Sequence, residues 1–255
     1  MNREKLIEKI IKKKEFSDLP KKDVEMAFSK FDDKKYLDEE KIKFTRDLLR
    51  KVFSVFTSKK ILSLKNKDAE WILKKHFSTR ERLNYYEKVY SRIFKNFKKA
   101  TVIDLGAGIN GFSYDYFKKV NCDVNYVGVE AMGQLVNLMN NYFIRNKISG
   151  NAIQESLFSL NEIKKIIKKT KEPRIVFLFK VFDSLEMLER NYSKKFLLEI
   201  SQFSEKIVIS FAIFSLVSRR KFNAQRKWLT DFLKENFKIL DDFEIGGERY
   251  IVFKK

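Results

Sequence analysis

From Ala100 onward, short runs of β-branched and aromatic residues alternate with stretches whose apolar residues recur at helical spacing. The strand-like runs are TVIDL, NYVGVE, NAIQES, RIVFLFK, KIVISFAIF, KILDDFEI and ERYIVFKK. The helical stretches are Phe112–Lys119, Gln134–Asn146, Glu162–Lys168, Tyr192–Phe203 and Phe222–Asn236. Strands separated by single helices pair in parallel through right-handed crossovers. Residues 99–255 are therefore predicted to form an α/β domain with a doubly wound sheet.

The last two strand-like runs are joined only by Gly246-Gly247, which predicts a tight hairpin. This hairpin is expected to place one antiparallel strand at the end of the sheet. A seven-stranded sheet with a terminal hairpin resembles the Rossmann-like domain of S-adenosylmethionine (SAM)-dependent methyltransferases.

The first 98 residues follow a different pattern, with apolar residues three or four apart, as at Phe44, Leu48 and Val52. No strand pattern interrupts them. Breaks are expected at residues 17–20, 32–35 and 58–68, which gives four or five helices, the last from Arg80 to Lys98. Residues 1–98 are therefore predicted to be an all-helical N-terminal lobe.

The chain is strongly basic, with a formal net charge of +20, and this charge indicates a polyanionic partner. Residues 1–100 carry 29 Lys and Arg against 16 Asp and Glu, so +13 of the net charge lies there. The lobe is expected to dock on folded RNA through phosphate contacts. Its basic runs are Lys12-Lys13-Lys14, Lys21-Lys22, Lys34-Lys35 and Lys59-Lys60. Solvated helix faces in a lysine-rich proteome would give the same pattern.

Other classes are disfavoured by composition. The single cysteine, Cys122, excludes a disulfide framework and a cysteine-based zinc site, and His76 is the only histidine, so no metal site is expected. No apolar run is long enough to span a membrane, and the first residues lack the apolar core of a signal peptide. We expect a soluble, cytoplasmic monomer.

The first strand-like run closes with Asp104-Leu105 and leads into Gly106-Ala107-Gly108. Glycines just past a strand let the backbone approach a ligand closely, and the following helix offers N–H groups. The second run ends in Glu130, at a position where an acidic side chain takes two ribose hydroxyls. Each feature alone is common in α/β proteins, but together they predict a SAM site. Gln154 and Glu155, near the end of the third run, are expected to face the adenine amino group.

A longer set of motifs resembles the aminoglycoside-resistance 16S rRNA (guanine-N7) methyltransferase family. The motif that carries most of this resemblance is His76-Phe77-Ser78-Thr79-Arg80-Glu81-Arg82-Leu83, followed by Tyr90 and by the glycine loop through Asn110. Further matches are Gln154–Leu157, Leu178–Lys180, Ser210-Phe211, Arg219, Lys221 and Glu248–Tyr250. The resemblance covers about residues 70–255.

The resemblance implies a role for several of these residues. Arg80 would pair with the methionine carboxylate of SAM, with His76 beside it and Lys180 at the cofactor edge or a phosphate. Ser210 and the run Arg219-Arg220-Lys221 would contact substrate RNA. Without the resemblance, Arg80 would be interpreted as part of a capped helix and the basic run as a solvated loop.

The sequence departs from the family in the loops expected to hold the target base. A proline expected after Asn110 is Gly111, one expected after Phe211 is Ala212, and two glycines expected before Arg219 are Val217-Ser218. These departures leave the target nucleotide less defined than the cofactor.

The implied activity is methyl transfer to guanine N7 of 16S rRNA in the decoding site. That nitrogen has a free lone pair, so the reaction requires alignment and no catalytic base. The alternatives are a methyltransferase of another RNA or of a small molecule, and an RNA-binding protein that kept the fold without catalysis.

Overall fold

The computed structural model describes residues 2–54, 68–213 and 226–255. Its helices are α1 (Arg3–Ile11), α2 (Lys21–Ser29), α3 (Asp38–Leu49), the π-helix η1 (Arg50–Ser54), α5 (Ala69–Lys75), α6 (Phe77–Arg82), the 3-10 helix η2 (Leu83–Tyr85), α7 (Tyr86–Ile93), the 3-10 helix η3 (Asn110–Ser113), α8 (Asp115–Lys119), α9 (Gly133–Arg145), α10 (Leu160–Lys169), α11 (Phe182–Leu188), α12 (Tyr192–Ser201) and α13 (Lys227–Asn236). The strands are β1 (Lys99–Leu105), β2 (Asp123–Glu130), β3 (Gly150–Gln154), β4 (Arg174–Phe179), β5 (Lys206–Ala212), β6 (Lys238–Ile245) and β7 (Glu248–Lys254).

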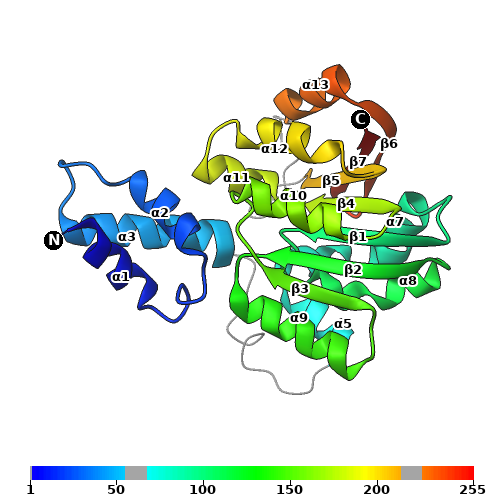
Figure 1. Ribbon diagram of the computed structural model, residues 1–255, viewed down its shortest axis with the longest axis horizontal. Helices are drawn as coiled ribbons and strands as arrows, with labels where there is room; N and C mark the ends of the chain where they lie inside the picture. The colour runs from blue at the N-terminus through cyan, green and yellow to red at the C-terminus, as the bar shows by residue number, and fades with distance from the viewer. Residues whose placement is uncertain (1, 55–67, 214–225) are drawn as a thin grey trace.

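The seven strands form one sheet in the order β3-β2-β1-β4-β5-β7-β6, as Figure 1 shows. The first five strands pair in parallel. The chain moves outward from β1 to β3, returns to β4 and then moves the other way. Right-handed crossovers therefore place the helices of the two halves on opposite faces of the sheet. The predicted Rossmann-like fold of residues 99–255 is confirmed.

The terminal hairpin differs from the expectation in one respect. β7 pairs antiparallel with both β5 and β6, so the antiparallel strand lies second from the end and β6 forms the edge. Burial explains this order, because the apolar run of β7 is buried on both faces whereas β6 carries lysine, aspartates and glutamate that remain largely exposed. Gly246 and Gly247 have φ of +63° and +80°, as a tight hairpin of this kind requires.

An N-terminal helical unit, residues 3–54, extends to one side of the sheet (Figure 1). Each helix turns its apolar side inward; Leu6, Ile7 and Ile10 are the buried residues of α1, at helical spacing. The unit meets the sheet domain where α2 and η1 contact α11. Buried side chains from Leu6 to Phe253 belong to one continuous core cluster.

The helices that follow this unit pack on the sheet domain, because α5 contacts η3 and α7 contacts α8. The helix expected from Arg80 to Lys98 is divided into α6, η2 and α7. That residues 1–98 act together as an RNA-docking lobe stays a prediction. No helix in the described ranges combines the length and apolarity that a membrane crossing demands.

Candidate cofactor cleft

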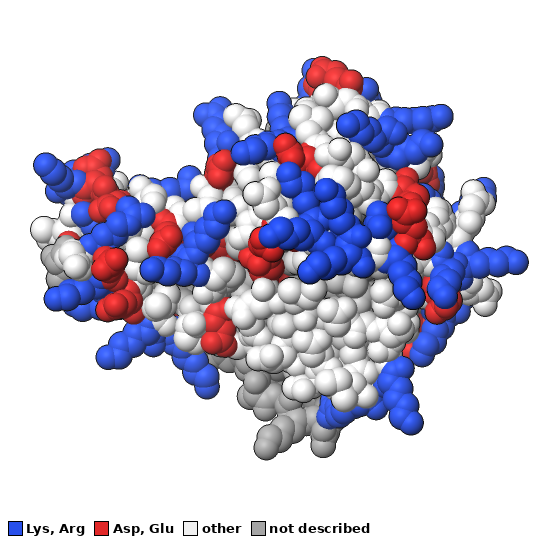
Figure 2. All heavy atoms as spheres, in the orientation of Figure 1, with Lys and Arg blue, Asp and Glu red and all other residues white. Residues whose placement is uncertain are grey.

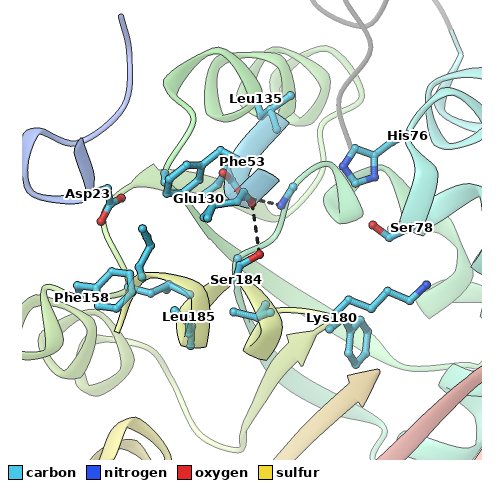
Figure 3. A pocket seen from close by; sticks show the side chains of 18 residues that line it. Asp23, Phe53, His76, Ser78, Glu130, Leu135, Phe158, Lys180, Ser184 and Leu185 are labelled. Atoms are coloured by element: carbon cyan, nitrogen blue, oxygen red, sulfur yellow. Dashed lines mark hydrogen bonds between the residues drawn. The ribbon is translucent and has the colours of Figure 1, made fainter. Parts of the chain in front are cut away.

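A cleft opens at the carboxyl ends of β1, β2 and β4, next to the point where the strand order reverses. Figure 3 shows its side chains. The lining residues are Asp23, Val52, Phe53, His76, Ser78, Gly106, Gly108, Glu130, Ala131, Leu135, Leu157, Phe158, Phe179, Lys180, Val181, Ser184, Leu185 and Leu188. Among the predicted cofactor residues, His76, Gly106, Gly108, Glu130 and Lys180 line this cleft.

The loop after β1 needs its two glycines. Gly106 and Gly108 have φ of +75° and +55°, in the left-handed region. A Cβ on Gly106 would lie 2.7 Å from Cγ2 of Val181, and one on Gly108 would lie 3.3 Å from Nε2 of His76. The N–H groups of Gly106 and Ala107 donate to the carbonyl of Val129 on β2, at 2.8 and 3.0 Å. The loop is thus fixed against β2 with bare backbone facing the cleft.

Glu130 ends β2 and is held by two backbone donors. Its Oε2 accepts from the N–H of Gly108 at 2.8 Å, and its Oε1 accepts from the N–H of Met132 at 2.9 Å. Burial raises the pKa of the carboxyl, while the two backbone N–H groups act in the opposite direction. The residue is 8% exposed and lines the cleft, where the remaining lone pairs of its carboxylate can accept from hydroxyls of a ligand.

Asp104 lies beneath the glycine loop and does not line the cleft. Its Oδ2 accepts from the hydroxyl of Tyr126 and from Nδ2 of Asn110, both at 2.7 Å. Asn110 follows the glycines, so this bond holds the end of the loop to β1. Asp104 therefore supports the glycine loop from below, and its predicted part in cofactor binding stays a prediction.

Lys180 follows β4 in a left-handed conformation, with φ of +59°, which costs a non-glycine residue about 1 kcal/mol or more. Its N–H donates to the carbonyl of Ser210 at 3.0 Å. Its ammonium contacts the carboxylate of Glu81 and lies 3.3 Å from Oε2 of Glu248. These contacts fix a cation at the edge of the cleft.

Beneath Lys180, Arg82 and Glu248 form a buried ion pair, with Nη2 and Oε1 2.7 Å apart. Arg82 also donates to Tyr250 Oη at 3.1 Å and to Asn110 Oδ1 at 3.2 Å. The Arg82 and Lys180 charges keep the pKa of Glu248 below its ordinary value despite burial. Ser210 is fully buried and its hydroxyl donates to Glu248, so its observed role is to support this pair. Its predicted contact with substrate stays a prediction.

His76 and Arg80 lie at the start and in the middle of the recognised motif. Burial, together with the charges of Arg82 and Lys180, lowers the pKa of His76 to about 3, so its imidazole is neutral at pH 7. Arg80 is exposed on α6, with its guanidinium 4.9 Å from the ring centroid of Phe77. It is outside the lining set, and its pairing with a cofactor carboxylate stays a prediction.

Gln154 ends β3, Glu155 follows it, and both are also outside the lining set. The amide of Gln154 donates to the backbone carbonyl of Asp18, in the N-terminal unit, and to that of Ala131 at 3.1 Å. Glu155 accepts from the N–H of Ser156 at 2.9 Å. Their predicted contact with adenine is untested. Arg219, Arg220 and Lys221 lie outside the described residues.

The sequence profile of the ribosomal RNA methyltransferase (FmrO) family matches residues 36–240, well over half of the chain. The chain belongs to the FmrO family. A 16S rRNA (guanine(1405)-N(7))-methyltransferase from Proteus mirabilis is 26% identical over 196 residues, which are 72% of this chain. The match spans 64% of that relative's length. The family resemblance inferred from the motifs is confirmed.

Several solved structures resemble this FmrO-family chain over its whole length, and two of them are RmtF and RmtB. The 16S rRNA methyltransferase RmtF in complex with S-adenosyl-L-homocysteine has a TM-score of 0.79 at 19% identity, with 100% of both chains covered. The 16S rRNA methylase RmtB has a TM-score of 0.79 at 17% identity, with 100% of this chain and 99% of RmtB covered. At these identities the likeness shows a shared fold.

In this FmrO-family chain the cleft also takes residues from the N-terminal unit, which the sequence did not predict. Asp23 of α2 lines it and accepts from the hydroxyl of Ser156, and Val52 and Phe53 of η1 line it as well. The carbonyl of Val52 accepts from Ser184 Oγ at 3.3 Å. No sequence signal identifies these residues, because their partners are more than a hundred positions away and Asp23 resembles an ordinary first-turn acid.

Proposed function

We propose that this protein is a SAM-dependent methyltransferase that methylates N7 of a guanine in the decoding site of 16S rRNA. The observation that carries the proposal is the cleft at the sheet's switch point, where Glu130 and the glycine loop are locked together by the Gly108 hydrogen bond. The family membership supplies the substrate class, ribosomal RNA. The relative from Proteus mirabilis is named for N7 methylation of a guanine in 16S rRNA, and this supports the finer assignment.

The residues of the cleft fit SAM. Glu130 presents a carboxylate for the ribose hydroxyls, and Gly106 and Gly108 line the cleft with bare backbone, where a Cβ would press on Val181 or His76. Lys180 supplies a fixed cation near the methionine end, and Arg80, two residues after the cleft residue Ser78, would bind the methionine carboxylate. When bound, SAM supplies an electrophilic methyl group, whose bond to sulfur breaks as its bond to N7 forms.

The chain's own residues then act by positioning. Guanine N7 offers a lone pair without deprotonation, so no residue is assigned as a base. The neutral imidazole of His76 lies against Gly108 and adds no positive charge near the sulfonium. The carboxylates of Glu81 and Glu248 hold Lys180 in place. Alignment of the methyl donor with guanine N7 in the cleft provides the rate enhancement.

The RNA is bound through charge. Figure 2 shows Lys and Arg side chains interspersed with Asp and Glu over the N-terminal unit and a denser group of Lys and Arg near α10, whereas the area over β3 and α9 carries few charges. We extend the proposal to the assembled 30S subunit as substrate, to phosphate contacts by Arg219, Arg220 and Lys221, and to a monomeric protein in the cytoplasm, where ribosomes are found.

The test is to incubate the protein with tritiated SAM and purified 30S subunits, then map the label by chain cleavage at N7-methylguanine. We expect one labelled guanine in the decoding site, with labelling that falls steeply as salt rises from 50 to about 200 mM. The control is 30S carrying adenine at that position, which should take no label. Label at another nucleotide would move the target, and no label on any RNA despite measurable SAM binding would refute the proposed activity.

A further inference from the structure

The lining residues are ordered along the cleft. In Figure 3, Asp23 and Phe158 lie at one end, Glu130 in the middle, and His76, Ser78 and Lys180 at the other end. If Glu130 binds the ribose, the adenine and the methionine arm extend toward opposite ends. The anionic methionine carboxylate suits the end with Lys180 and not the end with Asp23 beside Glu130.

The Asp23 end suits a purine. Phe158 lies beside Asp23 at this end, and its ring offers an apolar surface against which a planar base can pack. Asp23 also lines this end of the cleft and is 1% exposed. Ser156 donates to one oxygen of its carboxylate, and a carboxylate has capacity for further donors.

A buried carboxylate that faces a second acid is costly unless donors satisfy it. Burial, above all, and the nearby charge of Glu130 raise the pKa of Asp23 to about 6. The ammonium of Lys22 points to the carbonyl of Phe158, at 2.7 Å, and so does not pair with the carboxylate. The exocyclic amino group of adenine would supply a further donor on the cleft side.

We propose that Asp23, from the N-terminal helical unit, binds the cofactor by accepting a hydrogen bond from the exocyclic amino group of its adenine. This inference rests on the proposed use of SAM. Cofactor recognition is then shared between the sheet domain and a helix that lies more than a hundred residues from the β3 loop in sequence. Binding of the cofactor consequently tightens the packing of α2 on that loop.

The test compares the binding of S-adenosylhomocysteine and S-inosylhomocysteine by calorimetry. The second ligand carries a carbonyl oxygen in place of the amino group, so it would face the Asp23 carboxylate with an acceptor. We expect the native protein to prefer the adenosyl ligand at least tenfold. Asp23→Asn can donate to the carbonyl, so its preference should vanish or reverse.

Two matched variants distinguish recognition of adenine by Asp23 from an indirect effect of how α2 packs on the loop after β3. Lys22→Met removes a contact between the same helix and the β3 loop, and Ser156→Ala removes the donor to Asp23 while keeping the carboxylate. Both should retain the preference of the native protein. A native preference that survives in Asp23→Asn, or that disappears in Lys22→Met, would overturn the inference. Failure of the native protein to bind either ligand would refute the proposed cofactor instead.

Discussion

Arg80 and Arg82 lie on the same short helix in opposite environments. Arg82 is 3% exposed and pairs with Glu248 at 2.7 Å, whereas Arg80 is exposed. Removing one member of a buried ion pair leaves the other charge uncompensated, so Arg82→Ala should lower the free energy of unfolding by about 3–5 kcal/mol. Urea denaturation measures this change.

Arg80→Ala is the matched control for that prediction. An exposed substitution of this kind should change stability by no more than about 0.5 kcal/mol. If Arg80 binds the methionine carboxylate as proposed, the same variant should weaken SAM binding while it melts like the native protein. Equal loss of stability in both variants would contradict the different roles assigned to them.

Glu130, the predicted ribose ligand, lines the cleft. Replacing its carboxylate by the amide in Glu130→Gln removes the charge and one acceptor oxygen. Either a backbone N–H of the glycine loop or a ribose hydroxyl then loses its hydrogen-bond partner. Loss of a hydrogen bond to a charged group costs about 1.5–3 kcal/mol, and we expect SAM binding to weaken about ten- to a hundredfold. Calorimetry measures the dissociation constant of SAM for this variant. An unchanged value would exclude Glu130 from the ribose site.

For single residues, the sequence allows a role to be predicted where that role depends on residues nearby in the chain. Gly106, Gly108 and Glu130 could be predicted because a strand followed by a particular turn gives the same local geometry in many proteins. Asp23 and the Arg82–Glu248 pair could not, since each depends on a partner at least 133 positions away. Composition offers no signal for such pairs.

At the scale of elements, the β6–β7 hairpin brings Glu248 onto Arg82. Gly246 has φ of +63°, and a Cβ there would lie 2.3 Å from Cδ2 of Tyr85 on η2. Gly246→Ala should therefore destabilise the protein by about 1–3 kcal/mol through strain and overpacking together. Thermal unfolding checks this, and Tyr85→Ala in the same chain should recover part of the loss by opening the space.

The strands were predictable because each is a compact apolar run bounded by polar turns. The helices were harder to predict from the sequence. α11 was missed, since its seven residues FDSLEML follow β4 too closely to form a separate periodic stretch. The single helix expected from Arg80 to Lys98 is broken where Arg82 turns into the core to meet Glu248, a tertiary contact that local periodicity does not register.

For the whole molecule, the buried carboxyl of Asp23 lies where the N-terminal unit meets the sheet domain. Its ionisation makes the free energy of unfolding depend on pH. The folded-state pKa of Asp23 is raised from 3.8 to about 6, chiefly by burial, with Glu130 and Glu155 nearby and Lys22 opposing them. A raised carboxyl pKa means that the folded state holds the proton more tightly than the unfolded state. The contribution of Asp23 to stability therefore falls as pH rises from about 4 to about 6, by about 3 kcal/mol at most.

Asp23→Asn tests this directly, since the amide keeps an acceptor for the Ser156 hydroxyl and carries no charge. We expect the variant to gain stability over the native protein as pH rises through this window, with the gain constant above about pH 7. Asp33→Asn is the control: Asp33 is exposed and its pKa is lowered by the N–H of Lys35, so no gain should develop there.

If Asp23→Asn is instead less stable than the native protein at pH 7, the deprotonated carboxylate must be stabilised in the folded state. A saturating cofactor should shrink the gain, because its adenine amino group would stabilise the charged form of Asp23 alone.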